Sequence, residues 1–258
     1  MLNVVTAGRG VPVVLVHAFP LSHVMWQDQA AALSQFSCVI APDMPGFGGS
    51  NRQGKPSIPD MVREVASALD QQGVKEPVFI AGLSMGGYIV FEFFRQFPKR
   101  VRGLGFFSTR AAADTPEAKE NRFKTADKVL VEGLGAFSKA ILPKLLGKTT
   151  LISHPNTAKR VTDMILANKK EGVADALHAM AGRCDSSDLL GSIRVPTLIV
   201  AGGEDTFIPV AESEAMADRI PEAEFHVIKQ AGHLVNLEQP DEFTRILDRF
   251  IAADMISR

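Results

Sequence analysis

The chain has 258 residues, a length that fits one α/β domain with a single core. Apolar residues make up 46% of the chain and charged residues 22%, a balance that is typical of a folded globular protein and excludes extensive disorder. The formal net charge is −1 and the two signs are interleaved, so the sequence lacks the basic stripe that binding of nucleic acid requires.

The cysteines and the hydropathy of the sequence indicate the cellular environment of the protein. Cys38 and Cys184 lie far apart, so we expect two reduced thiols and neither a disulfide nor a thiolate metal site. The most apolar run near the N-terminus, Val11–Val16, is too short to span a membrane, and Pro12 and His17 fit a signal peptide poorly. We therefore expect a cytoplasmic protein without a membrane or nucleic-acid partner; the sequence leaves its oligomeric state open.

The first part of the chain alternates short apolar runs with longer amphipathic ones. Leu2–Thr6 leaves room for one strand. Continuously apolar runs then predict buried parallel strands at Val13–Val16, Cys38–Ala41, Val78–Ala81 and Leu104–Phe107. The stretches between them predict helices at Ser22–Phe36, Ile58–Gln72 and Met85–Phe97.

Residues 111–192 interrupt this alternation with helical spacing alone. We expect a helical insertion that caps the site, the alternative being extra helices packed on the flank of the sheet. Beyond Pro196 the alternation resumes with a strand, a helix, a strand and a helix at Thr197–Ala201, Val210–Arg219, Glu224–Ile228 and Pro240–Ala253. The pattern predicts a doubly wound, mostly parallel α/β core from residues 1–110 and 193–258.

The G-x-S-x-G motif around Ser84 is the strongest chemical signal. It follows a predicted strand and begins a predicted helix, which is the context of a nucleophile elbow. A serine on so tight a turn needs small neighbours, which Gly82 and Gly86 provide. The helix N-terminus directs free N–H groups at a developing oxyanion, so we expect Met85 N–H to be one donor. We assign the second to Phe19, in the loop after the first core strand.

Candidates for an orienting acid and a general base follow in the order that this motif requires. Glu204 and Asp205 both come just after a predicted strand, where open α/β sheets carry functional groups. His233 comes just after the last predicted strand, behind Gly232. A histidine here would take the proton of Ser84, and the acid would fix its tautomer.

Five segments together resemble the α/β-hydrolase superfamily. They are His17–Pro20, Asp43–Ser50, and the runs at 82–87, 202–209 and 231–233. The pattern is most similar to single-domain carboxylesterases, enol-lactonases and non-haem haloperoxidase-like perhydrolases. The resemblance implies an α/β-hydrolase fold, Asp205 rather than Glu204 as the acid, and no cofactor or metal. The chain departs from the family pattern at Ala18, where glycine is usual, and in its short N-terminus, which predicts seven strands instead of eight.

The substrate pocket is predicted from proximity to the carboxyl ends of the strands. In similar enzymes a residue at the position of Trp26 faces the acyl group. Phe107, Phe207 and Leu234 adjoin loops at the same edge of the sheet, and an apolar wall favours uncharged acyl groups. Arg110 lies beyond that edge, where a paired arginine is the alternative to a contact with a substrate carboxylate.

The sequence thus predicts a serine-dependent carboxylic ester hydrolase for small or medium apolar acyl esters, acting through an acyl-enzyme. The same triad also serves lactone hydrolysis, C–C bond hydrolysis and perhydrolysis, which remain alternatives. A hydrolase-fold receptor for a small molecule is the alternative from another class. Epoxide hydrolases and haloalkane dehalogenases fit less well, because they use an aspartate where Ser84 stands.

Overall fold

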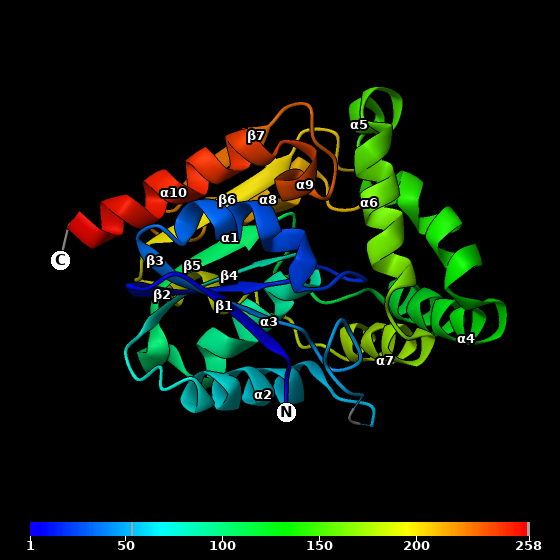
Figure 1. Cartoon of the computed structure of the whole chain (residues 1–258), viewed down its shortest axis with the longest axis horizontal. Coiled ribbons are helices and arrows are strands. Elements are labelled where there is room, and N and C mark those ends of the chain that lie inside the picture. Colours follow the sequence, from blue (N-terminus) through cyan, green and yellow to red (C-terminus); the bar gives the residue numbers. More distant parts are fainter. Residues whose placement is uncertain (53, 257–258) are drawn as a thin grey trace.

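A twisted sheet runs through the computed structural model, which describes residues 1–52 and 54–256 (Figure 1). In these residues the sheet has seven strands: β1 (Val4–Ala7), β2 (Val11–Val16), β3 (Ser37–Pro42), β4 (Val78–Leu83), β5 (Val101–Phe107), β6 (Thr197–Gly202) and β7 (Glu224–Ile228). Their order in space is β1-β3-β2-β4-β5-β6-β7, and only β1 pairs antiparallel. The prediction of a mostly parallel, seven-stranded sheet is confirmed.

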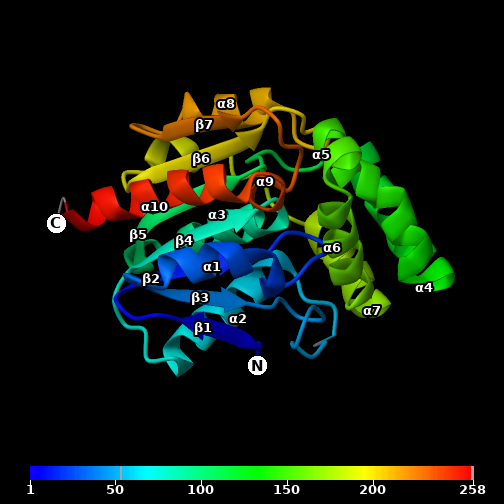
Figure 2. The ribbon, with the colours of Figure 1, turned by 45° about the horizontal axis from the view of Figure 1, so that its top comes forward.

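Helices cover both faces of the sheet. On one face α1 (Gln27–Leu33) contacts α10 (Pro240–Ile256), and on the other α2 (Ile58–Gln71) contacts α3 (Met85–Gln96) (Figures 1 and 2). α8 (Val210–Ala217) packs on β6 and β7, and the short α9 (Val235–Glu238) precedes α10. The predicted helix at Ser22–Phe36 is divided into a 3₁₀ turn, η1 (His23–Trp26), and α1. Two further 3₁₀ turns are η2 (Pro98–Arg100) and η3 (Leu190–Ser192).

Four helices fall within residues 111–192, and they gather beyond the carboxyl ends of the parallel strands (Figure 2). They are α4 (Pro116–Leu145), α5 (Lys148–Ser153), α6 (Pro155–Leu166) and α7 (Lys170–Ala181). α4 packs on α6 and α7 and is interrupted at Gly133, whose φ of 79° is not helical. That these helices act as a cap stays a prediction. No helix of the described residues is both long enough and apolar enough to cross a bilayer.

Backbone segments approach one another closely at the turn from β4 into α3. Ser84 lies between them with φ 55° and ψ −111°, a conformation that non-glycine residues rarely adopt. A Cβ added at Gly82 would lie 2.2 Å from the carbonyl carbon of Gly86, and one at Gly86 would lie 2.3 Å from Val16 O on β2. Backbone occupies both sides of the turn, so a side chain at either glycine would have to displace it.

Gly82→Ala is expected to lower the free energy of unfolding by about 1–3 kcal/mol, because the methyl group would overlap backbone atoms that cannot move independently. Urea denaturation measures this. Gly135→Ala is the matched control: Gly135 lies within α4, with no atom within 4 Å of an added Cβ. The control should leave stability unchanged or raise it by up to about 1 kcal/mol. Equal losses in the two variants would contradict the argument.

Candidate active site

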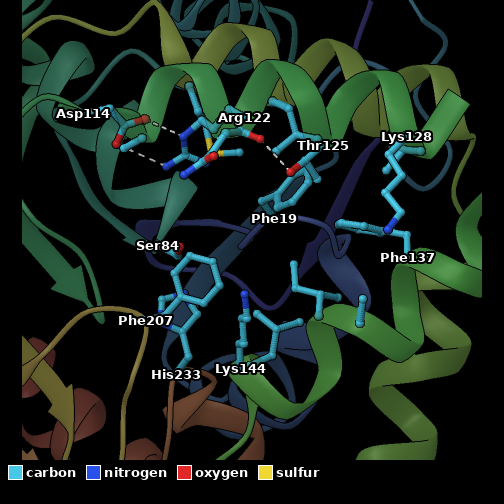
Figure 3. Close-up of a pocket in the computed structure, with 18 of the residues that line it drawn as sticks. Phe19, Ser84, Asp114, Arg122, Thr125, Lys128, Phe137, Lys144, Phe207 and His233 are labelled. Carbon is cyan, nitrogen blue, oxygen red and sulfur yellow. Dashed lines mark hydrogen bonds and ion pairs between the residues drawn. The ribbon is translucent and has the colours of Figure 1, made fainter. Parts of the chain in front are cut away.

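Ser84 is fixed on the elbow by its own backbone. Its N–H donates to Phe107 O at 2.9 Å, and Thr109 Oγ1 donates to its carbonyl oxygen at 2.9 Å. Such strained residues cost of order 1–3 kcal/mol and persist only where their surroundings hold them. The side chain of Ser84 lines a cavity of about 440 Å³ (Figure 3). The fold therefore places Ser84 in the wall of this cavity.

His233 and Asp205 are in direct contact. Nδ1 of His233 lies 2.8 Å from Oδ2 of Asp205, and both side chains are almost fully buried. The other oxygen of Asp205 accepts hydrogen bonds from the backbone N–H groups of Phe207 (2.7 Å) and Ile208 (2.9 Å). An ionised carboxylate can only accept, so Nδ1 of His233 is the donor and Nε2 is left to accept a proton. His233 lines the same cavity as Ser84.

Glu204, the other acid that the sequence offered, turns away from this histidine. Its carboxylate accepts from the N–H of Thr149 at 2.8 Å and from the hydroxyl of Thr149 at 2.6 Å. It therefore binds the N-terminal turn of α5. Of the two acids, Asp205 is the one that the structure places on His233.

A second buried carboxylate, Glu238, holds the loop that carries His233. It accepts from Gly147 N–H at 2.7 Å and Leu234 N–H at 3.0 Å. Burial raises the pKa of Glu238, although these hydrogen bonds lower it in part. Sequence reasoning did not single out Glu238, because its partners, Gly147 just before α5 and Leu234 beside His233, meet only in the fold.

The loop after β2 is positioned by His17. Burial lowers the pKa of this histidine, which keeps the ring neutral. Its Nδ1–H donates to Ala18 O at 3.0 Å, and its Nε2 accepts from Met44 N–H at 2.9 Å. The ring thus joins the loop after β2 to the loop after β3. Phe19 lies two residues after His17, forms a cis peptide with Pro20, and lines the cavity.

Met85, the other expected donor, is the first residue of α3 and is fully buried. The first N–H groups of a helix have no intrahelical acceptor, and the helix dipole adds partial positive charge there. The backbone of Met85 is therefore suited to bind an anion formed beside Ser84. That Met85 and Phe19 act together in this way stays a prediction.

The predicted pocket residues divide into one that lines the cavity and three that do not. Phe207 lines it, as expected. Trp26 is fully buried elsewhere, with its ring 6.2 Å from Phe107 and 6.1 Å from Phe243 of α10. Phe107 and Leu234 are also fully buried and outside the cavity lining. The prediction for Trp26, Phe107 and Leu234 is wrong, because proximity to the carboxyl edge does not reveal that α10 and the core cover these side chains.

Most of the cavity wall comes from α4. Its apolar part includes side chains from both parts of that helix and from the loop after β6: Val129, Phe137, Ile141, Leu145, Phe207 and Ile208. The wall also carries charged residues on α4 and on the segment before it, namely Arg110, Asp114, Arg122, Lys128, Glu132 and Lys144. The expected apolar wall is therefore only part of the lining.

Three arginines surround Asp114, whose side chain is fully buried. Arg183 lies 2.9 Å and Arg110 3.1 Å from its carboxylate, and Arg122 of α4 forms a third ion pair (Figure 3). Burial raises the pKa of Asp114, but the ion pairs with Arg122 and Arg183 outweigh it and lower the pKa to about 2. Arg110 is thus a paired arginine. Arg183 is 69 residues from Asp114 in sequence, and no local pattern indicates the contact.

Asp114 gives a pH dependence with a defined sign. Its pKa is lower in the folded state, so its contribution to stability is present above about pH 4 and is lost as the pH falls toward about 2. The stability gap between the wild type and Asp114→Asn should therefore narrow by roughly 1 kcal/mol between about pH 5 and pH 3, measured by urea denaturation. Asp127→Asn, an exposed change on α4, is the control. A gap that stays constant would contradict the role of the arginines.

Comparison with known proteins agrees with this fold. A family model for the alpha/beta hydrolase fold matches residues 11–240. An esterase from Thermogutta terrifontis, solved with malate bound, has a TM-score of 0.96 and 40% identity, covering 98% of this chain and 93% of that one. An enol-lactonase from Burkholderia xenovorans has a TM-score of 0.89 and 26% identity, covering 97% and 96%. The 3-oxoadipate enol-lactonase 1 of Acinetobacter baylyi is 27% identical over 93% of this chain and 88% of that protein. The chain belongs to the α/β-hydrolase fold family and is a hydrolase.

Proposed function

We propose that this protein is a serine-dependent carboxylic ester hydrolase that forms an acyl-enzyme on Ser84. One observation carries the proposal: a histidine fixed by a buried carboxylate lines the same cavity as a serine on a strained strand-to-helix turn. This combination supports nucleophilic catalysis, because a serine hydroxyl needs an adjacent base to become a nucleophile.

The steps follow from the donors and acceptors present. Nε2 of His233 accepts the proton of Ser84 as Oγ attacks the ester carbonyl, and Asp205 stabilises the imidazolium. The N–H groups of Phe19 and Met85 bind the oxyanion. The tetrahedral intermediate expels the alcohol, which takes its proton from His233. Water then attacks the acyl-enzyme, His233 accepts the proton of that water and returns it to Ser84 Oγ, and the carboxylic acid leaves.

Small and medium acyl esters are the substrates that the cavity favours. A volume of about 440 Å³ and the apolar part of its lining suit an aliphatic acyl chain. The similar esterase supports ester hydrolysis, and the two similar enol-lactonases favour lactone hydrolysis as the second candidate. Parallel assays with simple esters and lactones separate the two.

A fluorophosphonate is expected to form a covalent adduct with Ser84, because Ser84 is the serine that shares a cavity with His233. Peptide mass spectrometry locates the adduct, and Ser84→Ala should abolish it. Ser108 is the matched control, since it also follows a strand and has a positive φ of 41° but is buried outside the cavity lining. Labelling that persists in Ser84→Ala and disappears in Ser108→Ala would reject the assignment.

Asp205→Asn should reduce kcat for a p-nitrophenyl ester by about 10⁴, because an amide no longer fixes the tautomer that leaves Nε2 free to accept a proton. Glu204→Gln is the matched control, since Glu204 is adjacent but binds Thr149. Circular dichroism verifies that both variants are folded. A greater loss of kcat in Glu204→Gln than in Asp205→Asn would show that the acid is misassigned.

A further inference from the structure

Positively charged side chains outnumber negatively charged ones in the lining of the cavity. Four cationic side chains line it, Arg110, Arg122, Lys128 and Lys144, against the two carboxylates of Asp114 and Glu132. The two arginines share Asp114 with Arg183, and Lys128 lies 3.7 Å from Glu132. Among the residues that the structure describes, no carboxylate lies within ion-pair distance of Lys144. Within the described part of the chain, Lys144 is therefore the cationic side chain of the cavity lining that has no carboxylate partner.

Lys144 is held close to the proposed catalytic residues by its neighbours in the chain. The carbonyl oxygen of Leu145 accepts from Leu234 N–H at 3.3 Å, directly after His233. Gly147 N–H donates to the buried Glu238, which also binds Leu234 N–H. These contacts fix the end of α4 beside the loop of His233. In Figure 3 the side chain of Lys144 points into the cavity.

A stripe of apolar side chains on the same helix, α4, lies next to Lys144. Phe137, Ile141 and Leu145 recur at intervals of four residues and all line the cavity. Residues three or four positions apart lie on one face of a helix, so Lys144 lies at the border of this stripe, three residues after Ile141. An aliphatic segment can pack on the stripe while a negatively charged group at its end reaches the ammonium group.

Lys144 is also in the last turn of α4, where a cation interacts favourably with the helix dipole. If that were its only role, replacing Lys144 would change the stability of α4 but would have no effect on the choice of substrate. The two roles are therefore separable by experiment.

We propose that Lys144 determines specificity by binding a carboxylate carried by the substrate, so that the preferred substrates are esters or lactones with a free carboxylate group. This inference rests on the proposed ester hydrolysis and deepens it by naming the substrate class. Lys144 is exposed, so the ion pair forms where the cavity wall meets solvent, and a charge-assisted hydrogen bond is stronger than one between neutral groups.

The test compares esters that differ only in this charge. Methyl hydrogen adipate is paired with its neutral amide, methyl 6-amino-6-oxohexanoate, which places the charge on the acyl side. The anion of 6-acetoxyhexanoic acid is paired with 6-acetoxyhexanamide, which places it on the alcohol side. Release of methanol or acetate gives kcat/KM for the wild type, Lys144→Met and Lys139→Met. Lys139 is the matched control, a lysine of α4 that is exposed like Lys144 but lies outside the cavity lining.

In at least one pair the wild type should prefer the charged ester by about tenfold or more, the range of a hydrogen bond to a charged group. Lys144→Met should bring that ratio close to unity, whereas Lys139→Met should keep it. A wild type without preference, or a preference that survives in Lys144→Met, overturns the inference while leaving ester hydrolysis intact.

Absence of turnover for every ester, p-nitrophenyl esters included, would instead reject the proposed function. Calorimetric binding of adipate and of adipamide to the wild type and Lys144→Met then decides the role of Lys144. Tighter binding of adipate that is lost in Lys144→Met supports a carboxylate site. Equal binding of the two compounds to the wild type, or a preference for adipate that persists in Lys144→Met, overturns it.

Discussion

The close approach of backbone at the turn between β4 and α3 is the constraint on which the site depends. Gly82, Gly86 and Val16 meet at distances that leave no room for a Cβ. Because these atoms belong to two neighbouring strands and the first turn of a helix, their contact sets the conformation of Ser84 and the position of the loop after β2. The N-terminus of α3 and the loop that carries Phe19 are thus placed by the same contact. Strain at Ser84 is sustained by this closely packed backbone.

The helices of residues 111–192 are tied to the sheet by buried polar contacts near this edge. Asn168, at the end of α6, donates to Pro20 O at 2.8 Å and accepts from Gly48 N–H at 2.9 Å. Asp114 binds Arg122 at one end of α4, and Glu238 binds Gly147 just beyond its other end. Each contact satisfies polar groups that burial would otherwise leave unpaired. Specific hydrogen bonds and ion pairs therefore attach the helices that bound the cavity to the rest of the protein.

Sequence patterns predicted the strands and the order of Ser84, Asp205 and His233 because these depend on local signals. Parallel strands covered on both faces are continuously apolar, and a strand-to-helix turn around a serine needs glycine. The pocket was harder to predict. Trp26 adjoins the right loop in sequence, yet α10 covers it, and only the packing of distant helices decides that. Helical spacing in α4 indicated an apolar face but not that Lys144 would border the cavity, since spacing does not name the surface against which a helix packs.

Most of the cavity wall comes from one segment of the chain, and this arrangement bears on which substitutions can change the choice of substrate. The groups proposed for the chemistry come from residues 19, 84, 85, 205 and 233, whereas most of the wall comes from residues 110–145. The residues proposed to react and most of the residues that line the cavity therefore occupy separate stretches of the chain. Substitutions along one helix can alter which molecules fit the cavity without changing the residues proposed to react, so selectivity can change separately from the reaction type.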